Sequence, residues 1–292
     1  MSGFTISTLN LDTEIKENII REVDFLNREG IDVHLTEQLY GKFFFLDCSL
    51  DEAKDQTVKV SHEKILRSYL ANIITDLLMN VITKKIMSRI AKNRYHYLNP
   101  AELKAIVQDA YTYLNNLHEE GDIGKTLYRH NQILTEVSDY LKSNTNLYLE
   151  GFLRFRLKNY FHELETSLDT AVENFLLEQE YREFIRLLRY FVEAQEPRID
   201  EVHVLIKDKQ NFYLLDEEQN PINKQQLEWV LVEFNQTNDY DDLLLSALVT
   251  IAPRKVVLHI RHKSEIVETI INIFQERVVV CKGCKICDHE TN

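Results

Sequence analysis

The stretch KVVLHIRHKSEIVETIINIFQERVVVC, residues 255–281, changes its apolar pattern twice. KVVLHI is a short β-branched run, SEIVETIINIF repeats its apolar residues at helical spacing, and RVVVC is strand-like again. A strand, a helix and a strand in this order predict a βαβ unit, and a parallel pair with a right-handed crossover is its default form. The stretch therefore predicts an α/β domain in this part of the chain.

Cys281 ends the second predicted strand and begins a run of three cysteines at equal two-residue gaps, in CKGCKICDH. In open α/β sheets, ligands collect beyond the carboxyl ends of the strands, so these thiols lie where a site is expected. Three cysteines and one histidine can complete a tetrahedral metal site. The candidate metal ligands are Cys281, Cys284, Cys287 and His289, with His259 or His262, at the end of the neighbouring strand, as an alternative fourth ligand.

The chemistry of this cysteine cluster stays open between several readings. The spacing suits a zinc site, and C-x2-C-x2-C also resembles the run that binds iron–sulfur clusters. Lys282 and Lys285 favour thiolate over thiol, so a metal-free redox pair formed by Cys281 and Cys284 is a further alternative. A frayed segment without a role is the structural alternative.

The chain upstream of the βαβ unit supplies the rest of the C-terminal domain. EVHVLI and NFYLL are strand-like runs separated by polar KDKQ, which predicts a hairpin. Helices are predicted from Leu227 and from Tyr240 to Ile251. We place this domain at residues 197–292.

A helical block is predicted over residues 59–196. Ser61 is the predicted cap of a helix that reaches toward Arg94, and Asn99-Pro100 marks a second helix start. A third helix covers roughly 125–141, and a fourth segment runs without proline or glycine from 152 to 196. That segment carries a coiled-coil-like apolar seam, which EQE at 178–180 interrupts, so we expect a kink or a second helix there. The seam consists of Leu157, Phe161, Leu164, Leu168, Ala171 and Phe175.

The first part of the chain, residues 1–58, reads as a small mixed α/β unit. FTISTL, IDVHL and KFFFLDC are strand-like, and residues 15–26 have helical spacing before Gly30. Cys48, at the end of an apolar strand, reads as a small buried hydrophobe. The predicted fold class is therefore α+β: a mostly helical central domain between a small mixed unit and an α/β domain with a βαβ unit.

Composition limits the classes of function. A net charge of −13 over 292 residues argues against electrostatic binding of nucleic acid or an anionic membrane through a broad surface. The first residues lack a basic start followed by an apolar run, the most apolar stretch (YLANIITDLLMNVIT) is too short to span a bilayer, and the four cysteines do not form a secreted disulfide framework. We therefore expect a cytoplasmic protein.

Gly124-Lys125-Thr126 resembles the end of a phosphate-binding loop, but the first glycine of that motif is missing, so a helix-to-helix turn is favoured.

Two helical stretches mix basic and aromatic residues, EGFLRFRLKNYF and EYREFIRLLRYFVEAQEP. Such mixtures could bind single-stranded nucleic acid or another anion, although core aromatics with solvated or locally paired charges are the favoured reading. Arg186 is the residue of the second stretch that we expect to seek a distant partner. The candidate anion-binding residues are Arg154, Arg156, Lys158, Arg182, Arg186 and Arg189.

One face of an otherwise apolar helix carries a polar row that consists of Asn72, Asp76 and Asn80. We interpret this row as the solvent-exposed face of the helix or as the lining of a polar cavity. No catalytic triad or carboxylate pair stands out, so we name no catalytic residue.

The amino-acid sequence of several stretches resembles that of the YtxC-like family of proteins from spore-forming bacteria (Bacillota). The resemblance covers roughly 148–287 and is carried by EGFLRFRLKNYFHELETSLDTAVENFLLEQEYREFIRLLRYFVEAQEP, DDLLLSALVTIAPRKVVLHI and RVVVCKGCKIC. It implies a cytoplasmic bacterial protein linked by name to sporulation, and it lends no catalytic residues.

The favoured hypothesis is a non-enzymatic, cytoplasmic interaction protein with a C-terminal metal site of structural or sensory role. We expect a protein partner or self-association and no membrane span. The alternatives are a redox or metal-dependent enzyme, with zinc or an iron–sulfur cluster at the cysteines, and a protein that binds nucleic acid or another anion through its basic helices.

Overall fold

The computed structural model describes residues 3–9, 13–50, 56–115, 123–208, 211–222, 240–260, 264–284 and 287. The chain forms two compact units, Met1–Phe175 and Leu176–Asn292, and each combines helices with a four-stranded sheet. The predicted α+β class is confirmed. The division of the chain at 58/59 and at 196/197 stays a prediction, and the helix predicted from Leu227 lies outside the described residues.

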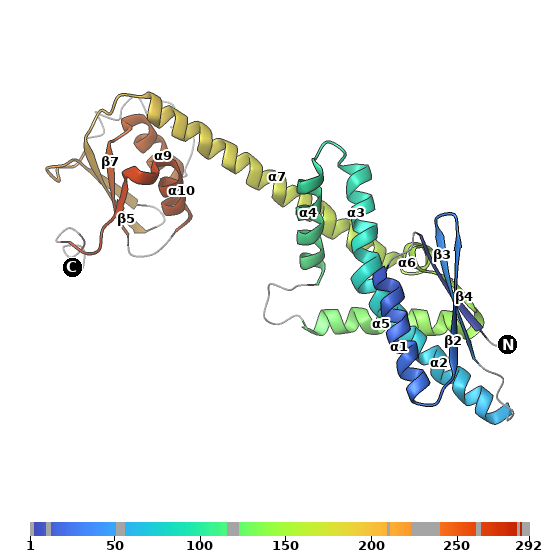
Figure 1. Cartoon of the computed structure of the whole chain (residues 1–292). Coiled ribbons are helices and arrows are strands. Elements are labelled where there is room, and N and C mark those ends of the chain that lie inside the picture. Colours follow the sequence, from blue (N-terminus) through green and yellow to red (C-terminus); the bar gives the residue numbers. More distant parts are fainter. Residues whose placement is uncertain are drawn as a thin grey trace. The chain divides into compact units, whose positions relative to one another are not determined.

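The sheet of the first unit has the strand order β2-β3-β1-β4. β1 pairs antiparallel with β3, β3 pairs antiparallel with β2, and Gly41, with a φ of 61°, makes the tight turn between β2 and β3. β4 pairs parallel with β1 and is only three residues long, which explains why the sequence did not predict it. The elements are β1 (Gly3–Leu9), α1 (Thr13–Arg28), β2 (Val33–Tyr40), β3 (Phe43–Leu50) and β4 (Asn146–Tyr148) (Figure 1).

Helices make up most of the remainder of the first unit. The first long helix begins at Gln56, so the predicted start at Ser61 was wrong, while the predicted start at Asn99 is confirmed by a full capping box. The segment predicted from 152 onward divides in two, because the chain leaves the helical conformation around Leu157. The helices are α2 (Gln56–Leu77), the π-helix η1 (Leu78–Ile82), α3 (Thr83–Arg94), α4 (Pro100–Leu114), α5 (Ile123–Ser143) and α6 (Leu149–Phe155). The helix α7 (Lys158–Ala194) begins in this unit, and its residues from Leu176 onward belong to the second unit.

The helix α7 continues through 178–180, so the second helix predicted there was wrong, while the alternative of a kink stays a prediction. Glutamate and glutamine are good helix formers, and all three side chains are exposed, so a break in the apolar seam costs the helix nothing there. Upstream, Leu164 and Leu168 are fully buried, as the seam predicts.

One continuous helical run, His62–Arg94, is long and apolar enough to cross a membrane by length and composition. Because 61% of its most apolar window is buried inside the structure, it is not a clear membrane span.

The second unit contains the sheet β6-β5-β7-β8. β5 and β6 form the predicted antiparallel hairpin, while β5 and β7, and β7 and β8, are parallel, which confirms the βαβ unit. The elements are β5 (Glu201–Asp208), β6 (Asn211–Leu215), α9 (Tyr240–Ile251), β7 (Lys255–His259), α10 (Glu265–Phe274), the 3-10 turn η3 (Gln275–Arg277) and β8 (Val278–Val280).

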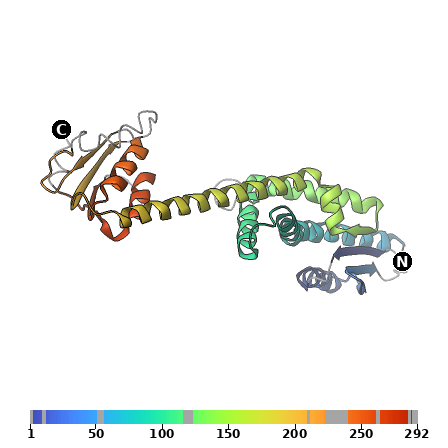
Figure 2. The same ribbon diagram turned by 90° about the horizontal axis from the view of Figure 1, so that it is seen from above.

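The two faces of this sheet have different surroundings. Figure 1 and Figure 2 both show α9 and α10 on the same side of the strands. Val204 and Leu258 point to that side and are fully buried in the core formed with the helices. Because side chains alternate along a strand, His203 on β5 and His259 on β7 lie on the opposite face.

A candidate metal centre at the ends of two parallel strands

The candidate metal centre begins where β7 and β8 end. The backbone N–H of Cys281 donates to the carbonyl of Leu258 at 2.9 Å, so the β7–β8 ladder continues one step and brings Cys281 beside His259. Gly283 then turns the chain with a φ of +123°, a conformation that favours glycine. The N–H of Gly283 donates to the sulfur of Cys281 at 3.4 Å. This turn brings the next cysteines back toward β7.

Four side chains converge at this place: His259, Cys281, Cys284 and Cys287. The sulfur of Cys287 lies 3.7 Å from that of Cys284 and 3.9 Å from that of Cys281. Nδ1 of His259 lies 3.3 Å from the sulfur of Cys287 and 3.5 Å from that of Cys284. All four ligand atoms lie within 4.8 Å of one another.

Four of the six distances between these atoms match the edges of a tetrahedron around a single ion. With metal–sulfur bonds of about 2.3 Å and metal–nitrogen bonds of about 2.0 Å, a regular tetrahedron has S–S edges of about 3.8 Å and S–N edges of about 3.5 Å. The S–S contacts of 3.7 and 3.9 Å and the S–N contacts of 3.3 and 3.5 Å agree with these edges. The four residues could therefore hold a metal ion.

The electrostatic state of His259 suits a metal ligand. The ring is 7% exposed, and burial, with a smaller contribution from nearby His203, lowers its pKa. Nε2 of His259 lies 3.0 Å from Nδ1 of His203, and Nε2 of His203 lies 3.4 Å from a carboxylate oxygen of Glu201. The other oxygen of Glu201 accepts a hydrogen bond from Lys255 at 2.8 Å. A neutral imidazole keeps a lone pair for a metal.

Without a metal ion, the surroundings of Cys287 favour its thiol over its thiolate. Burial, and hydrogen bonds with the thiols of Cys284 and Cys281, raise its pKa to about 11. We predicted that Lys282 and Lys285 stabilise thiolates, but this effect does not dominate at the sulfur of Cys287. Lys285 lies outside the described residues. A metal ion must therefore displace a proton from Cys287 on binding.

Of the ligands predicted from the sequence, the structure brings together the three cysteines and the alternative histidine, His259. His262 and His289 lie outside the described residues. His203 was missed, although alternation in EVHVLI places it on one face of its strand. The missing information was strand order, since only the pairing of β5 with β7 brings His203 to His259. That these residues bind a metal stays a prediction.

The predicted anion-binding residues make contacts within their own units. Arg154 lies over the rings of Phe155 and Phe161, and Arg156 over that of Tyr140. Arg156 and Lys158 also line a pocket of about 430 Å³ in the first unit. Their anion-binding role stays a prediction.

The three arginines of the second basic stretch lie on α7. Arg182 donates to the carbonyl of Glu178, and Arg186 pairs with Glu183 at 3.4 Å. The residue that reaches a distant partner is Arg189, which donates to the carbonyl of Asn272 at 2.7 Å, rather than Arg186. Their anion-binding role also stays a prediction.

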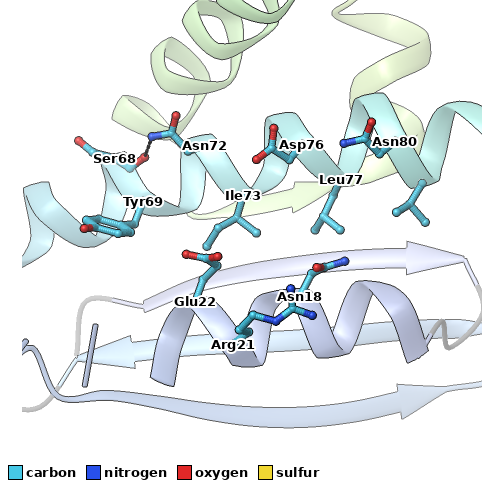
Figure 3. A pocket seen from close by; sticks show the side chains of 11 residues that line it. Asn18, Arg21, Glu22, Ser68, Tyr69, Asn72, Ile73, Asp76, Leu77 and Asn80 are labelled. Carbon is cyan, nitrogen blue, oxygen red and sulfur yellow. Dashed lines mark hydrogen bonds between the residues drawn. The ribbon is translucent and has the colours of Figure 1, made fainter. Parts of the chain in front are cut away.

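The polar row on α2 and η1 lines a pocket of about 750 Å³ with residues of α1 (Figure 3). Asn72, Asp76 and Asn80 follow one another along the helix, while Ile73 and Leu77 point toward α1. The row makes hydrogen bonds within the unit: Asp76 contacts His130 at 3.2 Å, Asn80 accepts from the hydroxyl of Tyr111, and Asn72 donates to the carbonyl of Ser68. The three polar side chains of the row are therefore hydrogen-bonded within the unit.

Comparison with known proteins places the chain in a family. The model of the YtxC-like family matches residues 68–279, which include His203 and His259 and end before Cys281. The chain is 32% identical over 155 residues to the uncharacterized protein YtxC of Bacillus subtilis (strain 168), with 52% of this chain covered. The aligned region is 54% of that relative, so the chain spans about half the length of the curated relative it matches. No solved structure matches the chain. The family model covers well over half of the sequence, and the chain therefore belongs to the YtxC-like family.

Proposed function

We propose that the chain is a non-enzymatic interaction protein whose C-terminal unit is stabilised by one zinc ion. The observation that carries this proposal is the set of four ligand atoms within 4.8 Å of one another, four of whose six separations match the edges of a single-ion tetrahedron. We further propose that the protein acts in the cytoplasm during sporulation. This part rests on the resemblance to a family linked by name to sporulation and on the acidic composition.

The geometry favours zinc over an iron–sulfur cluster. A cluster places several iron and sulfide atoms between its thiolates, so its ligands must stand further apart than the edges of a one-ion tetrahedron. The contacts of 3.7 and 3.9 Å between the sulfurs leave room for one ion. Thiolate and imidazole ligands in tetrahedral arrangement suit zinc among the available divalent ions.

The same geometry favours a structural role over a catalytic one. A catalytic zinc keeps one coordination position for water or substrate, whereas a structural zinc has four protein ligands. Three cysteines and His259 would supply four protein ligands and leave no position for water or substrate. Because the ligands come from the end of β7 and from the residues after β8, an ion would tie these two segments together.

The interaction role is supported by an exposed apolar face on α7. Residues at heptad spacing on this helix leave large apolar side chains in contact with solvent, the pattern of a helix that packs against a partner. The face consists of Leu177, Phe184, Leu187 and Phe191, all of which are about half exposed or more. We refer to these four residues as the α7 apolar face.

Metal analysis of anaerobically purified protein tests the zinc proposal. We expect one zinc per chain and no absorption in the visible range, because zinc has a filled d shell. Iron together with visible absorption bands would contradict the zinc assignment and support a cluster. Protein that contains neither metal, and takes up none on addition of zinc, would leave only thiols and overturn the proposal.

Substitution of Leu187 tests the α7 apolar face. Leu187→Glu is expected to reduce partner binding by at least tenfold, because a charge at the centre of an apolar contact must be desolvated. Leu127→Glu is the matched control, since Leu127 is 58% exposed on α5 and Leu187 is 56% exposed on α7. Partners are identified by affinity purification from sporulating cells with quantitative mass spectrometry, and self-association by sedimentation equilibrium. If both variants match the wild type in captured proteins and in mass, the α7 apolar face has no interaction role.

A further inference from the structure

We infer that His203 and Glu201 are positioning residues of the metal centre, which hold His259 in the one tautomer that can bind a metal through Nδ1. This inference rests on the proposed zinc site and adds residues that do not touch the ion. Histidine ligands generally donate their second ring N–H to an outer partner, and such partners tune metal affinity.

The sheet places the three side chains in one row. β5 and β7 pair in parallel, with Glu201 opposite Lys255 and Leu205 opposite His259. Glu201 and His203 are two residues apart on β5, so they share a face with His259 and lie away from the core that α9 and α10 cover. The rings of His203 and His259 have centroids 5.2 Å apart. The row therefore leads from the carboxylate of Glu201, through His203, to His259.

The carboxylate of Glu201, at the start of this row, sets the order of hydrogen-bond donors and acceptors along it. A carboxylate only accepts, so it favours a proton on the facing Nε2 of His203, 3.4 Å away. A neutral His203 with its proton on Nε2 has a bare Nδ1, which accepts from Nε2 of His259 at 3.0 Å. His259 then carries its proton on Nε2 and turns the lone pair of Nδ1 toward the sulfurs of Cys284 and Cys287.

The opposite order would work against metal binding. If His203 donated from Nδ1, Nε2 of His259 would accept, and a neutral His259 would carry its proton on Nδ1, facing the sulfurs. A metal could bind only after that proton had moved. Lys255 supports the favoured order, because its ammonium group donates to the second oxygen of Glu201 at 2.8 Å and fixes the position of that carboxylate at the end of the row.

Two variants of nearly the same shape separate the role of His203 from a merely structural one. Leucine removes the acceptor that faces His259, whereas the side-chain oxygen of asparagine lies where Nδ1 of the imidazole lies and can accept the same hydrogen bond. For His203→Leu we expect zinc affinity, measured by competition with a chelator, to fall roughly 10- to 100-fold. For His203→Asn we expect it to stay within about threefold of the wild type, since the acceptor is kept.

A second readout does not depend on bound metal. Two-bond 1H–15N NMR spectra of the metal-free protein, at a pH where both imidazoles are neutral, report which ring nitrogen of His259 carries the proton. We expect Nε2–H in the wild type and in His203→Asn, and a mixture of both tautomers in His203→Leu. A wild-type His259 protonated on Nδ1, or identical spectra and affinities for all three proteins, would overturn the inference.

The two readouts separate this inference from the proposed function. A wild-type chain that binds no zinc, but whose His259 tautomer changes in His203→Leu, contradicts the zinc proposal and supports the positioning role. A chain that binds zinc equally well in both variants, with unchanged tautomers, supports the zinc proposal and contradicts the positioning role.

Discussion

Replacing Cys284 by alanine is expected to remove zinc from the protein and to lower the melting temperature of the C-terminal unit by on the order of 15 °C. Cys284 contributes two of the distances that match tetrahedral edges, at 3.7 Å to Cys287 and 3.5 Å to His259. The variant keeps three ligands, which bind an ion far more weakly. An ion present at about a thousand times its dissociation constant stabilises a fold by about 4 kcal/mol, and this contribution disappears.

Calorimetry with elemental analysis measures both effects. Chelator added to the wild type should shift the same transition as the substitution does, which identifies the transition of the C-terminal unit. Cys48→Ala is the matched control, because Cys48 is a fully buried cysteine of the first unit and burial raises its pKa to about 12. It should keep one zinc per chain. A Cys284→Ala protein with undiminished zinc would show that this sulfur is not a ligand.

Replacing Leu258 by alanine is expected to destabilise the C-terminal unit by about 3 kcal/mol while the chain keeps its zinc. Leu258 is fully buried among the residues of the helix-covered core, so truncation removes apolar contacts and leaves a cavity. Its neighbour His259 points to the other face of the same strand. The prediction thus separates the two functions of β7, packing on one face and metal binding on the other.

Urea denaturation in the presence of excess zinc measures this loss, and elemental analysis of the folded protein measures the metal. Val280→Ala is the control: Val280 pairs with Leu258 across β7 and β8 but is 43% exposed, so its truncation should cost less than about 1 kcal/mol. Equal losses for both variants would contradict the assignment of Leu258 to the core. Loss of zinc from folded Leu258→Ala would contradict the independence of the two faces.

The parts of this fold that could be predicted from sequence are those with a strong local pattern. The run 255–281 encodes its own strand–helix–strand order, and the Asn99-Pro100 cap defines a helix start by itself. β4 could not be predicted, because three residues show no period and its pairing with β1 joins positions about 140 residues apart. The second helix expected after the apolar seam of α7 was a wrong prediction for a related reason, since an interruption of apolar spacing does not end a helix made of good helix formers.

The candidate site shows the same limit. Equal cysteine spacing at the end of a predicted strand was enough to locate the sulfurs, because strand ends are set by short-range pattern. The identity of the fourth ligand could not be predicted, since it depends on which of several histidines the sheet brings near the cysteines. Glu201 and His203 required the strand order β6-β5-β7-β8, which no local pattern encodes.

The placement of ligands on both sides of α10 has a consequence for local opening of the C-terminal unit. An ion held by His259 and by the cysteines after β8 closes the intervening chain into a ring that contains all of α10. Detachment of this helix must then occur within a closed loop, whose chain has fewer accessible conformations than a free segment. Amide protons of α10 should therefore exchange with solvent more slowly when the ring is closed, although none of the ligands belongs to that helix.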